Sequence, residues 1–144
     1  HVLKSPCLRH WGNLNLACPK DRLVHCNVLN RSHWLLQPSL AEAYGIAPCE
    51  AAHFGRPSIV ANVGGLPTVV LHQQTGLVMA VEATPDQYAQ EIEHHSIRTD
   101  EYHRLSENAS RRARETLNWD ECCSHIVDLF HRISNKKMPC QLIA

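Results

Sequence analysis

The chain has 144 residues, enough for one compact domain with its own hydrophobic core but short for an enzyme of two domains. Its 14 basic and 14 acidic side chains balance, so charge gives no reason to expect nucleic acid or an anionic membrane as a partner. No apolar run approaches the ~20 residues that span a bilayer, and the first residues contain no apolar core of a signal peptide. We therefore expect a soluble, cytoplasmic protein, with peripheral contact to a membrane left open.

The first part of the chain shows few periodic signals. Residues 1–22 mix proline and glycine with no regular spacing, which predicts an irregular segment. Residues 23–26 fit a short strand and residues 28–32 a brief helical turn. The apolar run 34–37, closed by Pro38, is typical of a buried strand in a parallel sheet.

The middle of the chain alternates predicted helices and strands. A loop at 39–44 leads into a helix from Gly45, which stops at Gly55 and has its spaced apolar positions at Ile46, Cys49, Ala52 and His53. We expect Cys49 and His53 to lie in or near the core. The next predicted elements are a buried strand at 58–61, a tight turn at 64–67, a short helix at 68–71 and a third strand at 77–80.

Three further helices are predicted after the third strand. Pro85 suits the first turn of a helix that carries Tyr88 and Ile92. The second helix is marked by apolar residues every three or four positions, at Tyr102, Leu105, Ala109, Ala113 and Leu117. Asn118 and Glu121 form the expected N-cap pair of the third, which we expect to bury Cys122, Ile126, Phe130 and Ile133.

Strands that alternate with helices predict an α/β domain with a mostly parallel sheet. We expect a Rossmann-like sheet with flanking helices at 23–134, between an irregular segment at 1–22 and a frayed tail at 135–144.

The cysteines and histidines show no pattern of a metal site or a disulfide framework. Seven cysteines include no Cys-x-x-Cys pair, and neighbouring helical side chains such as His94 and His95 point about 100° apart. We expect no metal, and we expect Cys122 and Cys123 to pack as small apolar side chains. The cluster of Arg111, Arg112 and Arg114 is interpreted as a solvated helix face.

Two loops are candidates for the ligand site, because ligands of such sheets bind beyond the carboxyl ends of the strands. They are residues 38–45 and 62–67. Gly45 lies at a predicted helix N-terminus, where free N–H groups and the helix dipole favour a phosphate. Five helical residues from Gly45 to Glu50 rise about 7.5 Å. Glu42 and Glu50 can therefore flank a diphosphate, each accepting hydrogen bonds from a vicinal diol of a nucleotide sugar.

Residues 38–51, Pro-Ser-Leu-Ala-Glu-Ala-Tyr-Gly-Ile-Ala-Pro-Cys-Glu-Ala, resemble the Glu-x7-Glu signature of family 4 glycosyltransferases. That family has Gly-Phe-Gly after the first Glu, where this chain has Ala43-Tyr44-Gly45. Three further segments resemble the family in order: residues 55–67 with Gly64-Gly65-Leu66-Pro67, residues 75–78, and Asn118-Trp119-Asp120. Thr68 stands where the family has Glu. The resemblance runs from about residue 23 to 133.

The resemblance implies the donor-binding, C-terminal domain of a retaining glycosyltransferase with the two-domain GT-B architecture. Glu42 would be catalytic and would bind hydroxyls of the transferred hexose, and Glu50 would bind the ribose. Backbone amides of Ala43, Tyr44, Gly45 and Ile46 would hold the sugar and phosphate, and Gly64 and Gly65 would line the same cleft. Such enzymes need no metal or cofactor. Their substrates are a nucleoside-diphosphate sugar and an acceptor, which is a glycan, a lipid or a small molecule.

The chain departs from the family on its amino-terminal side. Only 41 residues precede Glu42, and none of them matches the basic pair that clamps the diphosphate in the family. Because the acceptor domain is missing too, we expect this chain not to be a complete enzyme. Three hypotheses remain: a donor-binding half of an enzyme, a non-catalytic nucleotide-sugar binder or remnant, and a purely structural fragment.

Overall fold

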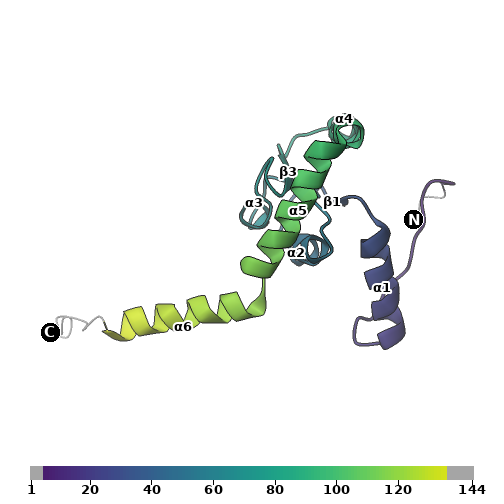
Figure 1. Ribbon diagram of the computed structural model, residues 1–144. Helices are drawn as coiled ribbons and strands as arrows, with labels where there is room; N and C mark the ends of the chain where they lie inside the picture. The colour runs from purple at the N-terminus through teal and green to yellow at the C-terminus, as the bar shows by residue number, and fades with distance from the viewer. Residues whose placement is uncertain (1–4, 136–144) are drawn as a thin grey trace. The chain divides into compact units, whose positions relative to one another are not determined.

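The computed structural model describes residues 5–135 and divides the chain into two compact units, His1–His33 and Trp34–Ala144, which are considered separately (Figure 1). The described part of the first unit contains helix α1 (Pro19–Arg31). The strand expected at 23–26 is therefore wrong, and the helical turn expected at 28–32 is the last part of this longer helix. Helix α1 also begins inside the segment expected to be irregular. Apolar residues of α1 form no clear stripe, and Leu23 is 62% exposed. Pro19 at the first helical position is the start signal that marks this helix.

The second unit is built on a three-stranded parallel sheet. Strands β1 (Leu35–Gln37), β2 (Ser58–Ala61) and β3 (Gly76–Met79) lie in the order β1-β2-β3. The register aligns Gln37 with Val60 and Val60 with Val78. This confirms the predicted α/β class and all three strands expected in this unit, each to within one residue. It also sets the carboxyl ends of the strands at one edge of the sheet.

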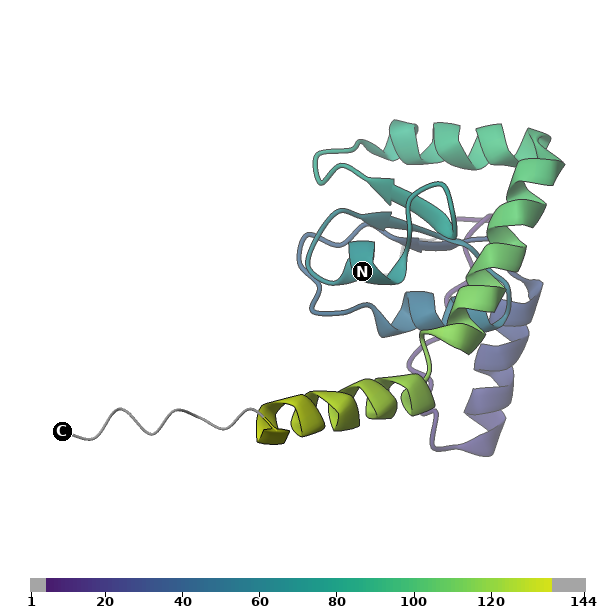
Figure 2. The same ribbon diagram turned by 60° about the vertical axis from the view of Figure 1, so that its left-hand side comes forward.

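Helices cover both faces of the sheet (Figure 2). On one face, Ile59 and Leu77 pack with Tyr88 of α4 (Pro85–Ile97). On the other face, Val60 packs with Leu66 and Val69 of the short helix α3 (Leu66–Val69). Because successive strand residues point to opposite faces, the side chain of Ile59 lies in one core and that of Val60 in the other.

Helix α2 (Ile46–His53) packs against α5 (Thr99–Glu115) through small residues. Ala52, Ala109 and Ala113 form their buried contact. The Ser106 hydroxyl donates a hydrogen bond of 2.6 Å to the carbonyl oxygen of Gly55, just beyond the end of α2. This close approach fixes the position of α2, the helix that carries the second glutamate of the motif.

Two expectations about burial are wrong. The strand β1 is at the sheet edge, and Leu36 is 47% exposed because α4 covers Ile59 and Leu77 but leaves the outer strand open on this face. His53 is exposed, whereas Cys49 packs against the core as expected. The His53 ring, at the last turn of α2, thus faces solvent although the position of His53 in the helical repeat matches the buried face.

Helix α6 (Trp119–Asn135) differs most from its prediction. Its N-cap is confirmed, since the Asn118 side-chain oxygen accepts a 2.9 Å hydrogen bond from the backbone N–H of Glu121. However, the side chains expected to be buried are all exposed: Cys122, Ile126, Phe130 and Ile133. Cys123, expected to pack as a small apolar side chain, is exposed too. Helical periodicity identified the apolar stripe correctly, but it does not predict whether another helix or strand packs against that stripe. Beyond Asn135, the predicted tail lies outside the described residues.

Within the described part of the chain, every helix is too short or too polar to traverse a bilayer.

Candidate functional site

Two loops at the carboxyl ends of β1 and β2 meet closely. Gly64 has a φ of 51°, and a Cβ on this residue would overlap the backbone carbonyl of Glu42. A Cβ on Gly65 would lie 2.7 Å from the carbonyl oxygen of Ala43 and 2.8 Å from the Cα of Tyr44. Both positions therefore require glycine for the loops to approach. The structure thus brings together the two segments that the sequence singled out.

The first loop ends at the N-terminus of α2, where Gly45 is the N-cap. Gly45 is buried and has φ 103° and ψ 63°, and a Cβ there would lie 2.6 Å from Leu66 of α3. Only glycine adopts this backbone without strain. The amides of Ile46 and Ala47 open the helix, so neither has a carbonyl one turn earlier within α2. Two N–H groups and the positive end of the dipole therefore meet beside Glu42 and Gly64.

The carboxylate of Glu42 is held at two points. Its Oε2 accepts a 2.6 Å hydrogen bond from the side-chain amide of Gln37, and its Oε1 accepts a 3.1 Å hydrogen bond from the N–H of Ala43. Sequence reasoning missed Gln37. The signal was a polar side chain at the end of an apolar strand, directly before Pro38.

Glu50 lies in the second turn of α2, half-buried and next to the fully buried Ala51. The helix spans Ile46–His53, so the predicted rise from the N-cap to Glu50 has the helical geometry that it assumed. The structure places Glu50 on the helix whose N-terminus forms one side of the site. Its role toward a ribose stays a prediction.

Tyr44 and Cys49 form a polar contact across the first turn of α2. The Tyr44 hydroxyl interacts with the Cys49 side chain, and burial, the largest cause, raises the pKa of each group. A raised pKa keeps the Cys49 thiol protonated near neutral pH, and a protonated thiol is a poor nucleophile. Cys49 therefore supports the conformation of Tyr44 more readily than it supplies covalent chemistry.

Arg112 of α5 fixes the far end of α3. Its guanidinium donates to the carbonyl oxygens of Thr68 at 2.6 Å and Val69 at 3.1 Å. Thr68, which stands where the family resemblance expects Glu, donates its hydroxyl to the carbonyl of Gly65 at 2.6 Å. The interpretation of all three arginines as a solvated face is therefore wrong for Arg112, which is half-buried and bonds the carbonyls at the end of α3.

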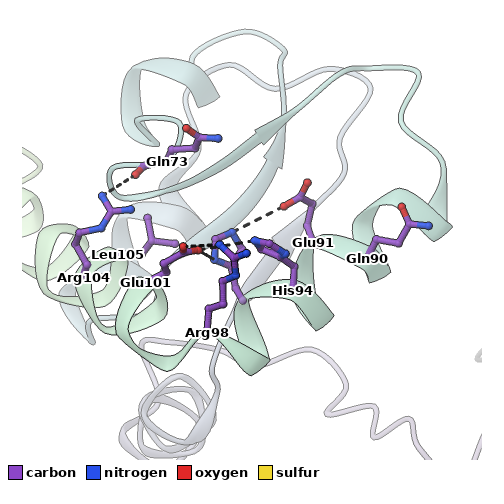
Figure 3. Close-up of a pocket in the computed structure, with 9 residues that line it drawn as sticks. Gln73, Gln90, Glu91, His94, Arg98, Glu101, Arg104 and Leu105 are labelled. Atoms are coloured by element: carbon purple, nitrogen blue, oxygen red, sulfur yellow. Dashed lines mark hydrogen bonds and ion pairs between the residues drawn. The ribbon is translucent and has the colours of Figure 1, made fainter.

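A cavity of about 460 Å³ lies at the opposite end of the sheet (Figure 3). It is lined by residues of α4, α5 and the turn before β3, among them Gln73, His95 and Glu101. Its charged groups interact with one another and with the backbone. Glu101 accepts from Arg98 at 2.9 Å, and Arg104 donates to the carbonyl of Gln73 at 3.2 Å. This cavity is separate from the loops that follow β1 and β2.

His95 lies buried in this cavity, between two carboxylates. Its Nε2 is 3.8 Å from Glu91, and its Nδ1 is 3.6 Å from Glu101. Burial, the largest cause, and the neighbouring His94 lower the pKa of His95. The Arg98 hydrogen bond lowers the pKa of Glu101. Within residues 5–135 no group of three or more His, Cys, Asp or Glu side chains is arranged to hold a metal ion.

The parallel sheet is covered by helices on both faces, and two loops meet through glycine contacts at the carboxyl ends of its strands; together these features define an α/β domain. Residues 20–112 match the family described as Glycosyl transferases group 1, and the chain belongs to this family.

Curated relatives include several D-inositol 3-phosphate glycosyltransferases. The protein of Streptomyces bingchenggensis is 32% identical over 113 residues, which are 78% of this chain and 24% of the relative. The protein of Mycobacteroides abscessus is 43% identical over 68 residues, 47% of this chain and 15% of the relative. The chain thus spans about a quarter or less of the length of these relatives.

Solved structures share the fold. Sucrose-phosphate synthase of Thermosynechococcus elongatus superposes with a TM-score of 0.65 at 24% identity, covering 74% of this chain and 26% of that one. Anabaena Alr3699/HepE in complex with UDP gives a TM-score of 0.66 at 19% identity, covering 73% of this chain and 29% of that one. The same Anabaena protein has been solved with UDP-glucose. The predicted fold class is confirmed as that of GT-B glycosyltransferases.

Proposed function

We propose that this chain is the donor-binding, C-terminal-type half of a family 4 retaining glycosyltransferase. It would bind a nucleoside-diphosphate hexose and present the sugar to an acceptor held by a separate, N-terminal-type domain. One observation supports this most strongly: the contacts of Gly64 and Gly65 hold the turn after β2 against the Glu42 loop, which runs directly into the N-terminus of α2. The proposal includes the earlier expectation of a cytoplasmic protein, with membrane contact left open.

The proposed roles follow the chemistry of the loop. Glu42 accepts hydrogen bonds from hydroxyls of the transferred hexose, and Glu50 accepts from the ribose. The Ala43 amide donates to Glu42 Oε1, so the amides of Tyr44 to Ile46 and the dipole of α2 attract the phosphates, which needs no metal at this position. A donor site that stabilises charge on the leaving diphosphate contributes a large part of such catalysis.

The comparisons support the donor class at the level of the family. The UDP and UDP-glucose complexes belong to a protein of 19% identity, so they show the shared fold and suggest which nucleotides to test first. Transfer itself, its retaining course and the identity of the acceptor are part of the proposal. A chain that binds donor without transferring sugar, even beside an acceptor domain, would be the alternative non-catalytic binder.

Ligand-observed NMR tests the proposal. The purified chain is titrated with UDP, GDP, UDP-glucose and GDP-mannose, alongside Glu50→Ala and the control Glu107→Ala. Glu107 is exposed on α5, so its loss should leave binding unchanged. We expect one nucleotide series to bind and Glu50→Ala to abolish that binding. Absence of binding by a chain that still melts cooperatively would refute the donor-site proposal for these 144 residues.

A further inference from the structure

Gln37 occupies a fixed position at the edge of the candidate site. It is the last residue of β1 and aligns with Val60 of the central strand. The next residue is Pro38, which restricts Gln37 to an extended backbone. Neighbouring residues of parallel strands share a face, so its side chain leaves the sheet on the same side as Val60 and α3. A strand residue with this backbone is a rigid anchor for the loop that follows.

The side chain of Gln37 reaches one carboxylate of this loop, that of Glu42. The Gln37 Nε2 donates to Glu42 Oε2 at 2.6 Å, a short distance typical of a hydrogen bond to a charged acceptor. The Ala43 N–H donates to Oε1 at 3.1 Å. Each carboxylate oxygen has two lone pairs, so one remains on each oxygen. Two parallel acceptor positions suit the two hydroxyls of a vicinal diol.

The other atom of the Gln37 amide shows what fixes its orientation. Gln37 Oε1 is buried and has no hydrogen-bond partner among the described residues. Turning the amide over would place Oε1 against Glu42 Oε2, two acceptors with no proton between them. The carboxylate therefore dictates the orientation and leaves Oε1 unpaired. A buried unpaired acceptor is unfavourable for folding, and such conflicts concentrate at functional sites.

Backbone contacts fix the main chain of Glu42, so only its side-chain torsions remain free to rotate. Gly64 contacts the Glu42 carbonyl closely and fixes the main chain of the loop at this point. The hydrogen bond from Gln37 then restricts the carboxylate. Precise sites depend on this kind of support from a rigid element, because an unsupported side chain samples several orientations.

We propose that Gln37 is a positioning residue that holds the Glu42 carboxylate in the orientation that accepts two neighbouring hydroxyls of the transferred sugar. The inference rests on the proposed function and adds to it a determinant of sugar affinity that is separate from nucleotide affinity. Gln37 acts through Glu42 and needs no contact of its own with the donor.

The test compares dissociation constants for UDP and UDP-glucose, or for the GDP and GDP-mannose pair if the wild-type chain selects it. Gln37→Met retains the length of the side chain and removes the amide. The matched control is Gln90→Met, on the exposed surface of α4. We expect Gln37→Met to weaken the sugar nucleotide about tenfold, the loss of one hydrogen bond to a charged group, and to leave the free nucleotide within about twofold. Gln90→Met should change neither constant.

A second pair of variants separates positioning from packing. Gln37→Asn keeps an amide that is too short to reach Glu42, and it should show the same selective loss if Gln37→Met fails to fold. In a Glu42→Gln background, Gln37→Met should have little further effect, because the carboxylate that it positions is gone. A merely structural role would instead weaken nucleotide and sugar nucleotide alike, in both backgrounds, and would overturn the inference.

The two proposals fail in different ways. If the wild-type chain binds neither nucleotide nor sugar nucleotide, the proposed function fails and the inference falls with it. If the wild-type chain binds the sugar nucleotide and Gln37→Met binds it equally well, only the role of Gln37 is refuted.

Discussion

Gly64 lies so close to Glu42 that no side chain fits between them: a Cβ on Gly64 would overlap the Glu42 carbonyl. This contact joins the turn after β2 to the loop after β1, and it depends on a backbone with φ 51°. The geometry of the candidate site therefore depends on a residue without a side chain as much as on its two glutamates.

Gly64→Ala should be strongly destabilising. The methyl group meets backbone rather than a flexible side chain, and the positive φ adds strain, so we expect a loss of about 2–4 kcal/mol in the free energy of unfolding. Urea denaturation measures it. Gly12→Ala is the control, because Gly12 has a φ of 72° with nothing near its missing Cβ. That control should lose only about 1 kcal/mol. Equal losses in the two variants would show that strain, not loop contact, makes Gly64 necessary.

Arg112 should matter more than its neighbours. Arg112→Met removes the donors to the Thr68 and Val69 carbonyls at the end of α3, and we expect a loss of about 1–2 kcal/mol in stability. Arg111→Met is the matched control, because Arg111 is exposed and bonds only to Asn108 on its own helix among the interactions described. Its effect should stay within about 0.5 kcal/mol. Indistinguishable urea midpoints for the two variants would restore the interpretation of Arg112 as a solvated residue.

Stability should fall with acid partly through His95. Burial lowers its folded-state pKa below the ordinary value of 6.5, so the unfolded chain binds a proton more readily. The free energy of unfolding is therefore unaffected by His95 above about pH 7, and it declines as the pH falls through 6.5 toward the lowered pKa. The groups that face His95 include Glu91 and His94 of α4, the adjoining Arg98, and Glu101 of α5.

His95→Phe keeps a ring beside Trp34 and cannot titrate. Its unfolding free energy should change less than that of the wild type between pH 7 and 5. His103→Phe, an exposed position on α5, should retain the wild-type slope. Glu101 contributes in the same direction but at lower pH, because its lowered pKa stabilises the folded state above its ordinary value of 4.5. An unchanged slope in His95→Phe would exclude this histidine as the source.

The sequence could predict the parts of the structure whose signal is local. Ser58–Ala61 is a short apolar run and became the buried central strand. Gly45 was identified as the start of a predicted helix and Gly64 as part of a predicted tight turn, and both adopt backbones that favour glycine. These features need only the chain within a few residues to be recognised.

What the sequence could not show depends on distant partners. Gln37 contacts Glu42 across a proline-interrupted loop, and Arg112 reaches carbonyls more than 40 residues away. Neither pairing follows from spacing. Burial failed for the same reason: Ile126 lies on a correctly identified stripe of α6, yet it is about half exposed because no described element covers it.

Phe130 and Leu105 make a final contrast between apolar pattern and burial. Both lie on the apolar stripes of amphipathic helices, but Leu105 of α5 is fully buried and Phe130 of α6 is 68% exposed. Leu105→Ala should lower the free energy of unfolding by about 2–5 kcal/mol, because it removes a fully buried side chain and leaves its volume empty. Phe130→Ala should change it by less than about 0.5 kcal/mol, since little of its ring leaves water on folding. Urea unfolding of the isolated chain, followed at several concentrations, measures both. A large loss for Phe130→Ala would mean that its ring is covered in solution. A loss that grows with protein concentration would identify the cover as another copy of the chain, because association stabilises the folded state more at higher concentration.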